Sequence, residues 1–201
     1  MGCLRPHHTL APPRRYLDTY KDVDIDEPFI GDWASDTAAL PYNLQGVRSR
    51  AIYSEREIRW ARRAFYALCT HIDQQIGALI GTIREEGILD NTIVMFTSDH
   101  GDMLGNHDLW AKQTYYEGSA NVPMIVVGEK DCSKTGFNRT DDRLVGLQDV
   151  MPTLLGLAGI ETPETVTGCS MTDGEKRDHL FGEFGENQHS SRMIRTQRHK
   201  L

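Results

Sequence analysis

The chain has 201 residues, of which 39% are hydrophobic and 25% are charged, and its net charge is −7. This balance is ordinary for a globular protein and excludes a disordered tail protein. No apolar run approaches the roughly 18 residues that a membrane helix needs. No basic stretch points to nucleic-acid binding. We therefore expect neither a membrane span nor a nucleic-acid partner, while a homo-oligomer stays open.

The sequence contains four cysteines that lie far apart: Cys3, Cys69, Cys132 and Cys169. Their spacing lacks the paired pattern of a zinc ribbon, and they are too sparse for a disulfide framework. The N-terminal residues lack the apolar core of a signal peptide, so no such peptide is visible. A cytoplasmic location follows only if Met1 is the true start.

Residues 1–53 contain scattered prolines and no clear hydrophobic periodicity. Only short helical or extended pieces fit such a stretch, which is unusual within a complete compact domain. We interpret it as an irregular active-site or linker segment, followed by a partial α/β domain at 54–201.

The clearest predicted element is a long helix at about 55–86. Ser54 and Glu57 form the Ser-x-x-Glu pattern of a capping box. Apolar residues then recur every three or four positions, which places them on one helical stripe. Gly87 follows and suits the left-handed conformation that ends many helices.

Several short apolar runs downstream predict strands. TIVMFTS at 92–98 and PMIVVG at 123–128 are rich in strand-forming residues and read as strands buried on both faces, as in a parallel sheet covered by helices. A strand-like piece at 143–147 precedes a helix near 150–158, with Asp149 as its predicted N-cap. The pieces HLFGEF and RMIRTQRHKL predict two further strands near the end of the chain.

Polar residues follow the first of these strands directly. Ser98, Asp99, His100 and Gly101 stand where ligands gather in open α/β sheets, at the carboxyl end of a strand. A carboxylate and an imidazole are common ligands of divalent cations. The alternative is that Asp99 caps a loop and His100 is a surface histidine with its hydrogen bonds satisfied. The residues alone leave both interpretations open.

Three further residues could take part in such a site. Lys112, in GNHDLWAKQTYYEG, carries a compact positive charge suited to an anionic ester or its leaving oxygen. His107, in the same segment, could donate a proton near neutral pH. His7 follows Pro6 near the N-terminus. The competing interpretation is a solvated loop and a mobile tail.

Five blocks in order resemble the sulfatase family of the alkaline-phosphatase-like superfamily: PHHTLAPPRRYLDTY, RRAFYALCTHIDQQIGALIGTIREEG, DNTIVMFTSDHGDMLGNHDLWAKQTYYEGSANVPMIVVG, LQDVMPTLLGLAG and GCSM. The motif Asp-His, rather than Asp-Asn, is most similar to the choline-sulfatase, arylsulfatase and phosphonate-monoester-hydrolase branch. The resemblance implies an α/β fold, an alkaline-phosphatase-like sandwich with a mixed, largely parallel sheet between helices. This sheet would be incomplete at both ends.

The resemblance also implies a metal-dependent sulfuric ester hydrolase, with Ca²⁺ as the expected cation and Mn²⁺ as the alternative. Asp99 and His100 match the later pair of the family's metal ligands. Lys112 matches the lysine that contacts the sulfate and the leaving oxygen. His7 matches the histidine that binds the ester or protonates the leaving group. His107 matches a common family histidine that we include among the catalytic candidates.

The family's nucleophile is a formylglycine made from Cys or Ser in a C/S-x-P/A-x-R motif. No cysteine or serine of this sequence begins that motif. We expect the nucleophile and the first metal ligands upstream of Met1, and this chain to be inactive alone. Two alternatives stay open: a phosphonate or phosphate ester hydrolase of the same superfamily, and a non-catalytic pseudoenzyme or interaction protein.

Overall fold

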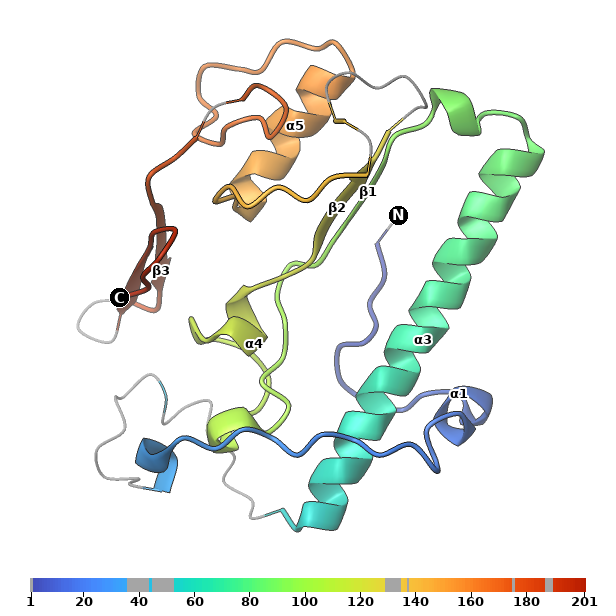
Figure 1. Ribbon diagram of the computed structural model, residues 1–201, viewed down its shortest axis with the longest axis vertical. Helices are drawn as coiled ribbons and strands as arrows, with labels where there is room; N and C mark the ends of the chain where they lie inside the picture. The colour runs from blue at the N-terminus through green and yellow to red at the C-terminus, as the bar shows by residue number, and fades with distance from the viewer. Residues whose placement is uncertain are drawn as a thin grey trace. The chain divides into compact units, whose positions relative to one another are not determined.

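The computed structural model describes residues 2–35, 44, 53–128, 135–136, 138–174, 176–186 and 190–201. Cys132 and much of the predicted irregular segment, at 36–43 and 45–52, lie outside the described residues. The chain forms two compact units, whose elements are labelled in Figure 1. Unit 1 comprises Met1–Asn91 and His100–Asn121, and unit 2 comprises Thr92–Asp99 and Val122–Leu201.

The dominant element of unit 1 is helix α3, Glu55–Glu85, which confirms the predicted helix. The Ser54 hydroxyl accepts a hydrogen bond from the Glu57 backbone N–H, and the Glu57 carboxylate accepts one from the Ser54 backbone N–H at 2.8 Å. These two bonds complete the predicted capping box. Gly87 has a φ of 70°, the left-handed conformation expected just after the helix.

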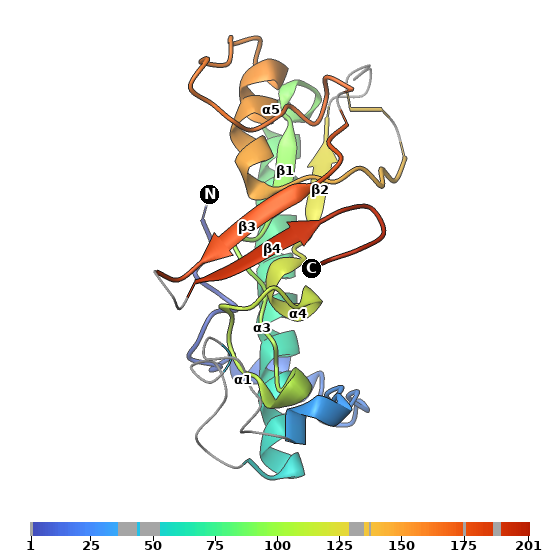
Figure 2. The same ribbon diagram turned by 90° about the vertical axis from the view of Figure 1, so that its left-hand side faces the viewer.

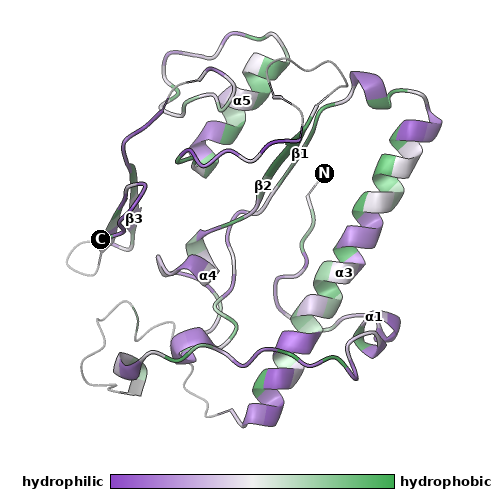
Figure 3. Cartoon of the chain, in the orientation of Figure 1, coloured by the Kyte–Doolittle hydropathy of each residue, from purple (hydrophilic) through white to green (hydrophobic). Residues whose placement is uncertain are grey.

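Helix α3 buries less of its apolar stripe than the periodicity predicts. Its buried residues all fall within 62–68, whereas Leu79 is 41% exposed. Hydrophilic and hydrophobic residues alternate along its length in Figure 3. Helix α1, Arg14–Asp18, packs against α3, and the Tyr16 hydroxyl donates to Gln74 Oε1 at 2.9 Å. Long-range contacts therefore fix only part of this helix.

Strands β1, Val94–Thr97, and β2, Met124–Val127, confirm the two predicted strands of unit 2. They pair antiparallel, and the second pair of strands in the described part of the chain is antiparallel as well. The largely parallel pairing that we expected is therefore not found there. Two parallel neighbouring strands need a long crossover connection. The longest helix between β1 and β2 is the four-residue α4, Glu117–Ala120. The chain therefore re-enters the sheet at the same end at which β1 leaves it, and β2 runs in the opposite direction.

The β1–β2 ribbon also differs from the predicted strands in its burial. Phe96 is 38% exposed, and Ile125, which lies opposite it, is 52% exposed. Val127 on the same face is 57% exposed. A two-stranded antiparallel ribbon buries both faces only when a layer packs on each side, so the expectation of two buried faces is wrong for the described residues.

Helix α5, Val150–Leu157, confirms the predicted helix, but Asp149 is not its side-chain cap. The Asp149 carboxylate instead accepts hydrogen bonds from the backbone N–H groups of Gly146, at 2.8 Å, and Cys169, at 2.9 Å. A carboxylate that is 2% exposed needs such partners, and here they come from the turn just before α5 and from the more distant Cys169 rather than from α5 itself. The buried aspartate therefore ties together two loops.

The remaining elements of unit 2 follow the sequence in part. Strands β3, Leu180–Phe184, and β4, Ser191–Arg195, form the antiparallel hairpin seen in Figure 2. The predicted strand at 143–147 is absent: residues 143–146 form no regular element, and Leu147 begins a 3-10 turn. Short 3-10 turns occur at Asp32–Ser35, Leu89–Asn91, Asn106–Asp108 and Leu147–Asp149.

The described helices and strands together fit a partial α/β fold. None of the described helices has the length and apolar character needed to cross a membrane. The described cysteines are free thiols: Cys3, Cys69 and Cys169.

Candidate active site

Three predicted site residues come together in unit 1. Lys112 Nζ lies 2.5 Å from His7 Nε2, and the ring centroids of His7 and His100 are 5.7 Å apart. The ring of His8, which the sequence interpretation did not assign, packs edge-on to His7 at a centroid distance of 4.5 Å. We call His7, His8, His100 and Lys112 the histidine–lysine cluster. Its members come from chain segments about half the sequence apart.

The hydrogen-bond partners assign the proton positions in this cluster. His100 Nδ1 lies 2.8 Å from the carbonyl oxygen of Gly101, which can only accept, so Nδ1 carries the proton. In the tautomer with its proton on Nδ1, His100 has its lone pair on Nε2, a nitrogen that commonly binds metals. The Lys112 ammonium can only donate, so His7 Nε2 accepts from it. The cluster thus places the Lys112 ammonium against an imidazole nitrogen of His7.

Arg5 holds the loop that carries His7 and His8. Its guanidinium donates to the carbonyl oxygen of His7 at 3.4 Å and to that of Thr9 across the loop. The sequence interpretation did not find Arg5, because an arginine in a proline-rich tail gives no pattern that distinguishes it from a solvated one. Its contacts show that this part of the N-terminal segment is a closed loop.

The segment that carries His100 and Lys112 folds back on itself through close backbone contacts. The Gly101 N–H donates to the Ser119 carbonyl at 2.8 Å, and the Met103 N–H donates to that of Ala111 at 2.7 Å. A Cβ on Gly101 would lie 2.1 Å from the carbonyl oxygen of Gly118, so only glycine fits there. We call residues 100–116 the site loop.

The site loop holds an unusual backbone. Five of its non-glycine residues have positive φ: Leu104, His107, Asp108, Ala111 and Gln113. Such conformations cost free energy and persist where surrounding contacts enforce them. One such contact comes from Arg62 of α3, which is 7% exposed and donates to the Leu104 carbonyl at 3.0 Å. The helix therefore anchors the loop.

His107 lies among aromatic rings. The described contacts of its ring are with residues outside the histidine–lysine cluster. Its Nδ1 accepts a hydrogen bond from the Gly31 N–H at 3.1 Å. Its ring centroid is 5.0 Å from those of Trp33 and Tyr116. These contacts join the 29–33 segment to the site loop, which supports a positioning role. A catalytic role for His107 stays a prediction.

Asp99 lies two residues after β1 ends at Thr97, at the strand end where the sequence predicts it. Among the residues that the structure describes, no group of three His, Cys, Asp or Glu side chains could hold a metal ion. Ca²⁺ takes about 6–8 oxygen ligands, so Asp99 and His100 could supply only part of a coordination shell. Their donor types fit a divalent cation, and their assignment as its ligands stays a prediction.

Comparisons with known proteins identify the family of this chain. The family model described as Sulfatase matches residues 2–160. An arylsulfatase of Clostridium perfringens is 38% identical over 209 residues, covering 100% of this chain and 43% of that protein. A choline-sulfatase of Rhizobium meliloti is 34% identical over 169 residues, covering 79% and 31% respectively. The chain therefore spans less than half the length of these relatives.

The fold has solved counterparts. A phosphonate monoester hydrolase from Silicibacter pomeroyi superposes with a TM-score of 0.85 at 24% identity, covering 98% of this chain and 45% of that one. Identity this low establishes the fold alone. The family model, by contrast, covers most of the chain, and its match includes every candidate site residue. The chain belongs to the sulfatase family.

Proposed function

We propose that this chain carries part of the active site of a metal-dependent sulfuric ester hydrolase of the arylsulfatase type. The observation that carries the proposal is the 2.5 Å contact between Lys112 Nζ and His7 Nε2, with His100 beside it. An ammonium held against an imidazole lone pair is a fixed positive charge. Such a charge is suited to the oxygens of a sulfate ester, on which negative charge grows as the ester bond breaks.

Each residue of the cluster has a distinct task in this proposal. An ammonium has three N–H donors, so the bond to His7 uses one and orients the others toward ester oxygens. Lys112 holds a proton at Nζ that can pass to the departing oxygen. His7 Nε2 then stabilises the lysine in that position. The His8 ring lies against His7 and forms one side of the site.

Asp99 and His100 are the residues that would hold the divalent cation, Ca²⁺ in the first place and Mn²⁺ as the alternative. When bound, the cation would neutralise charge on the ester oxygens. Asp99 offers a carboxylate and His100 the Nε2 lone pair that its bond to Gly101 leaves. The formylglycine expected for the family has no motif in these 201 residues. We therefore expect binding of the ester without turnover by this chain alone.

The test is a titration of the chain with p-nitrophenyl sulfate, followed through the imidazole nitrogen signals in NMR spectra. We expect the His7 and His100 signals to shift, and we expect Lys112→Ala to abolish the shift. Lys21→Ala is the matched control, because Lys21 is an exposed lysine paired with its neighbour Asp22. Unchanged signals, or an equal shift in Lys112→Ala, contradict the proposal.

A parallel titration with p-nitrophenyl phenylphosphonate, a phosphonate monoester with the same leaving group, examines the second candidate, a phosphonate ester hydrolase. The superposition on a phosphonate monoester hydrolase is the observation that keeps this candidate open, through the fold alone. Half-maximal shifts at a lower concentration of this phosphonate monoester than of p-nitrophenyl sulfate would favour it.

The metal assignment has its own test. Substoichiometric Mn²⁺ should broaden the signals of Asp99 and His100 more than those of His107, and Asp99→Asn should weaken the broadening. Equal broadening in that variant would contradict the assignment.

A further inference from the structure

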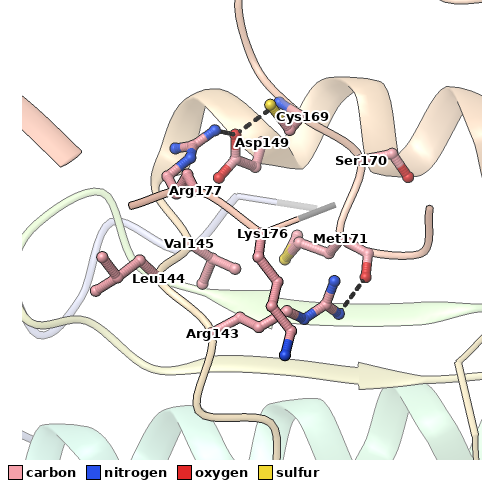
Figure 4. A pocket seen from close by; sticks show the side chains of 9 residues that line it. All are labelled: Arg143, Leu144, Val145, Asp149, Cys169, Ser170, Met171, Lys176 and Arg177. Atoms are coloured by element: carbon pink, nitrogen blue, oxygen red, sulfur yellow. Dashed lines mark hydrogen bonds and ion pairs between the residues drawn. The ribbon is translucent and has the colours of Figure 1, made fainter. Parts of the chain in front are cut away.

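Unit 2 contains a small cavity of about 40 Å³, shown in Figure 4. Three of the side chains that line it are cationic: Arg143, Lys176 and Arg177. Among the described residues that line it, Asp149 provides the one carboxylate. Cys169 is also among the residues that line this space. None of these residues belongs to the histidine–lysine cluster, so the cavity needs its own explanation.

The buried carboxylate neutralises one of the three cations. Arg177 Nη2 donates to Asp149 Oδ1 at 2.7 Å, and their side chains are 15% and 2% exposed. Asp149 also receives the backbone N–H of Cys169, so its oxygens are engaged in holding the wall of the cavity. Such a buried, hydrogen-bonded pair stays together, since separating it would leave an unpaired charge inside the protein.

A second carboxylate neutralises the second cation. Arg143 pairs with Asp141 at 2.7 Å and donates to the Met171 carbonyl, also at 2.7 Å. Hydrogen bonds from Arg143 lower the pKa of Asp141 to about 2, so this carboxylate is ionised at neutral pH. Lys176 is the third cation, and it has no carboxylate partner among the described residues. Among the described residues, these three cations and two carboxylates therefore leave one positive charge in excess.

We propose that this cavity binds one small tetrahedral oxyanion, inorganic phosphate or sulfate, between Lys176 and Arg143. A single buried water needs about 10–15 Å³ in the same measure, so the cavity has room for a few water-sized groups, which is the size of such an ion. In Figure 4 the Lys176 and Arg143 side chains extend to the same side of the cavity. Guanidinium and ammonium groups are the usual recognition elements for phosphate and sulfate oxygens.

The Cys169 thiol provides a local readout. We would measure alkylation of Cys169 by iodoacetamide in the full chain, using peptide mass spectrometry, with and without millimolar phosphate or sulfate. An ion in the cavity blocks access to the thiol and disfavours the thiolate that reacts. We expect several-fold slower labelling with the oxyanion and no change with chloride at matched ionic strength.

Variants separate this site from the histidine–lysine cluster. Lys176→Gln should remove the protection, whereas the exposed control Lys21→Gln should keep it. Lys112→Ala should also keep it, so this inference can fail or hold independently of the proposed function. Comparing phosphate with sulfate identifies the preferred ion by the lower protecting concentration.

Three results would overturn the inference: equal protection in Lys176→Gln, equal protection by chloride, or no protection at Cys169. Circular dichroism verifies that the variants fold. The contrast between the oxyanions and chloride in the unaltered chain decides the matter even if Lys176→Gln does not fold.

Discussion

Helix α3 and the site loop lie in the same unit but are stabilised in opposite ways. The helix begins with a capping box between Ser54 and Glu57, three residues apart, and ends at Gly87. The site loop takes backbone conformations that its own residues disfavour, and distant partners such as Arg62 hold it there. The helix is thus encoded locally. The loop that carries the candidate chemistry depends on the rest of the unit.

The largest expected effect is that of Gly101→Ala in the site loop. The new Cβ would lie 2.1 Å from a backbone carbonyl oxygen, so the backbone must move. Overpacking costs about 1–3 kcal/mol and occasionally more, and we expect at least the upper value here. Urea denaturation of the variant and the unaltered chain measures this loss in the free energy of unfolding. A change within about 0.5 kcal/mol, as for an ordinary surface substitution, would contradict the close approach.

Arg62→Met should have the next largest effect. It leaves the Leu104 carbonyl without its donor from the helix, which costs about 1–3 kcal/mol for a buried group. Hydrogen exchange should quicken in the site loop and not along α3. The control is Arg56→Met, on an exposed position of the same helix. Similar behaviour of both variants would mean that α3 does not anchor the loop.

Ser54→Ala removes the local start signal of α3. Loss of an N-cap costs about 1 kcal/mol, and the loss should appear as fraying of the first helical turn without a change in the His100 signals. Ser54→Thr, which keeps a capping hydroxyl, is the control and should retain most of the stability. A disturbed site loop in Ser54→Ala would break the distinction between the two regions.

Gly77→Ala in α3 should change stability in the opposite direction from Gly101→Ala. A Cβ at this position meets nothing within 4 Å, and alanine is favoured over glycine inside a helix by about 0.5–1 kcal/mol. A small rise in the urea midpoint is therefore expected. A fall would indicate that α3 has a neighbour at this position.

The smallest expected effect is a pH dependence at the start of α3. Hydrogen bonds from the Ser54 backbone N–H and hydroxyl lower the pKa of Glu57 from its ordinary 4.5. Because the pKa is lower in the folded state, the Glu57 carboxylate makes its full contribution to folding stability above pH 4.5. That contribution is lost as the pH falls through the lowered pKa. Helicity measured across that range should decline less steeply in Glu57→Gln. Identical profiles would show that the carboxylate contributes nothing.

The sequence predicts best where its signals are local. The capping residues and periodic stripe located α3, and short apolar runs located the four strands of the described residues, although they also predicted one at 143–147 that is absent. The parallel or antiparallel pairing of the strands was not predictable in the same way. The direction of a strand relative to its neighbour depends on the path of the chain that connects the two. Asp149 looked like a helix cap, since its partner Arg177 stands 28 positions away and no pattern links them.

The candidate site shows the same limit. His7, His100 and Lys112 were identified through motifs, and the structure brings them together. Arg5 and His8 were missed, because their importance lies in which carbonyls and rings they face. His107 carried a motif as well, but its ring contacts place it among aromatic residues that the motif did not indicate.

The left-handed residues of the site loop constrain which substitutions the chain can accept. At Ala111, with a φ of 61°, and Gln113, with a φ of 78°, glycine would relieve backbone strain while removing little. At His107 glycine would relieve the same strain but forfeit the ring contacts. In a saturation library, glycine should therefore be enriched at Ala111 and Gln113 and depleted at His107. Tolerance of glycine would then separate two kinds of position: those that only shape the backbone of the site loop, and those whose side chains make contacts.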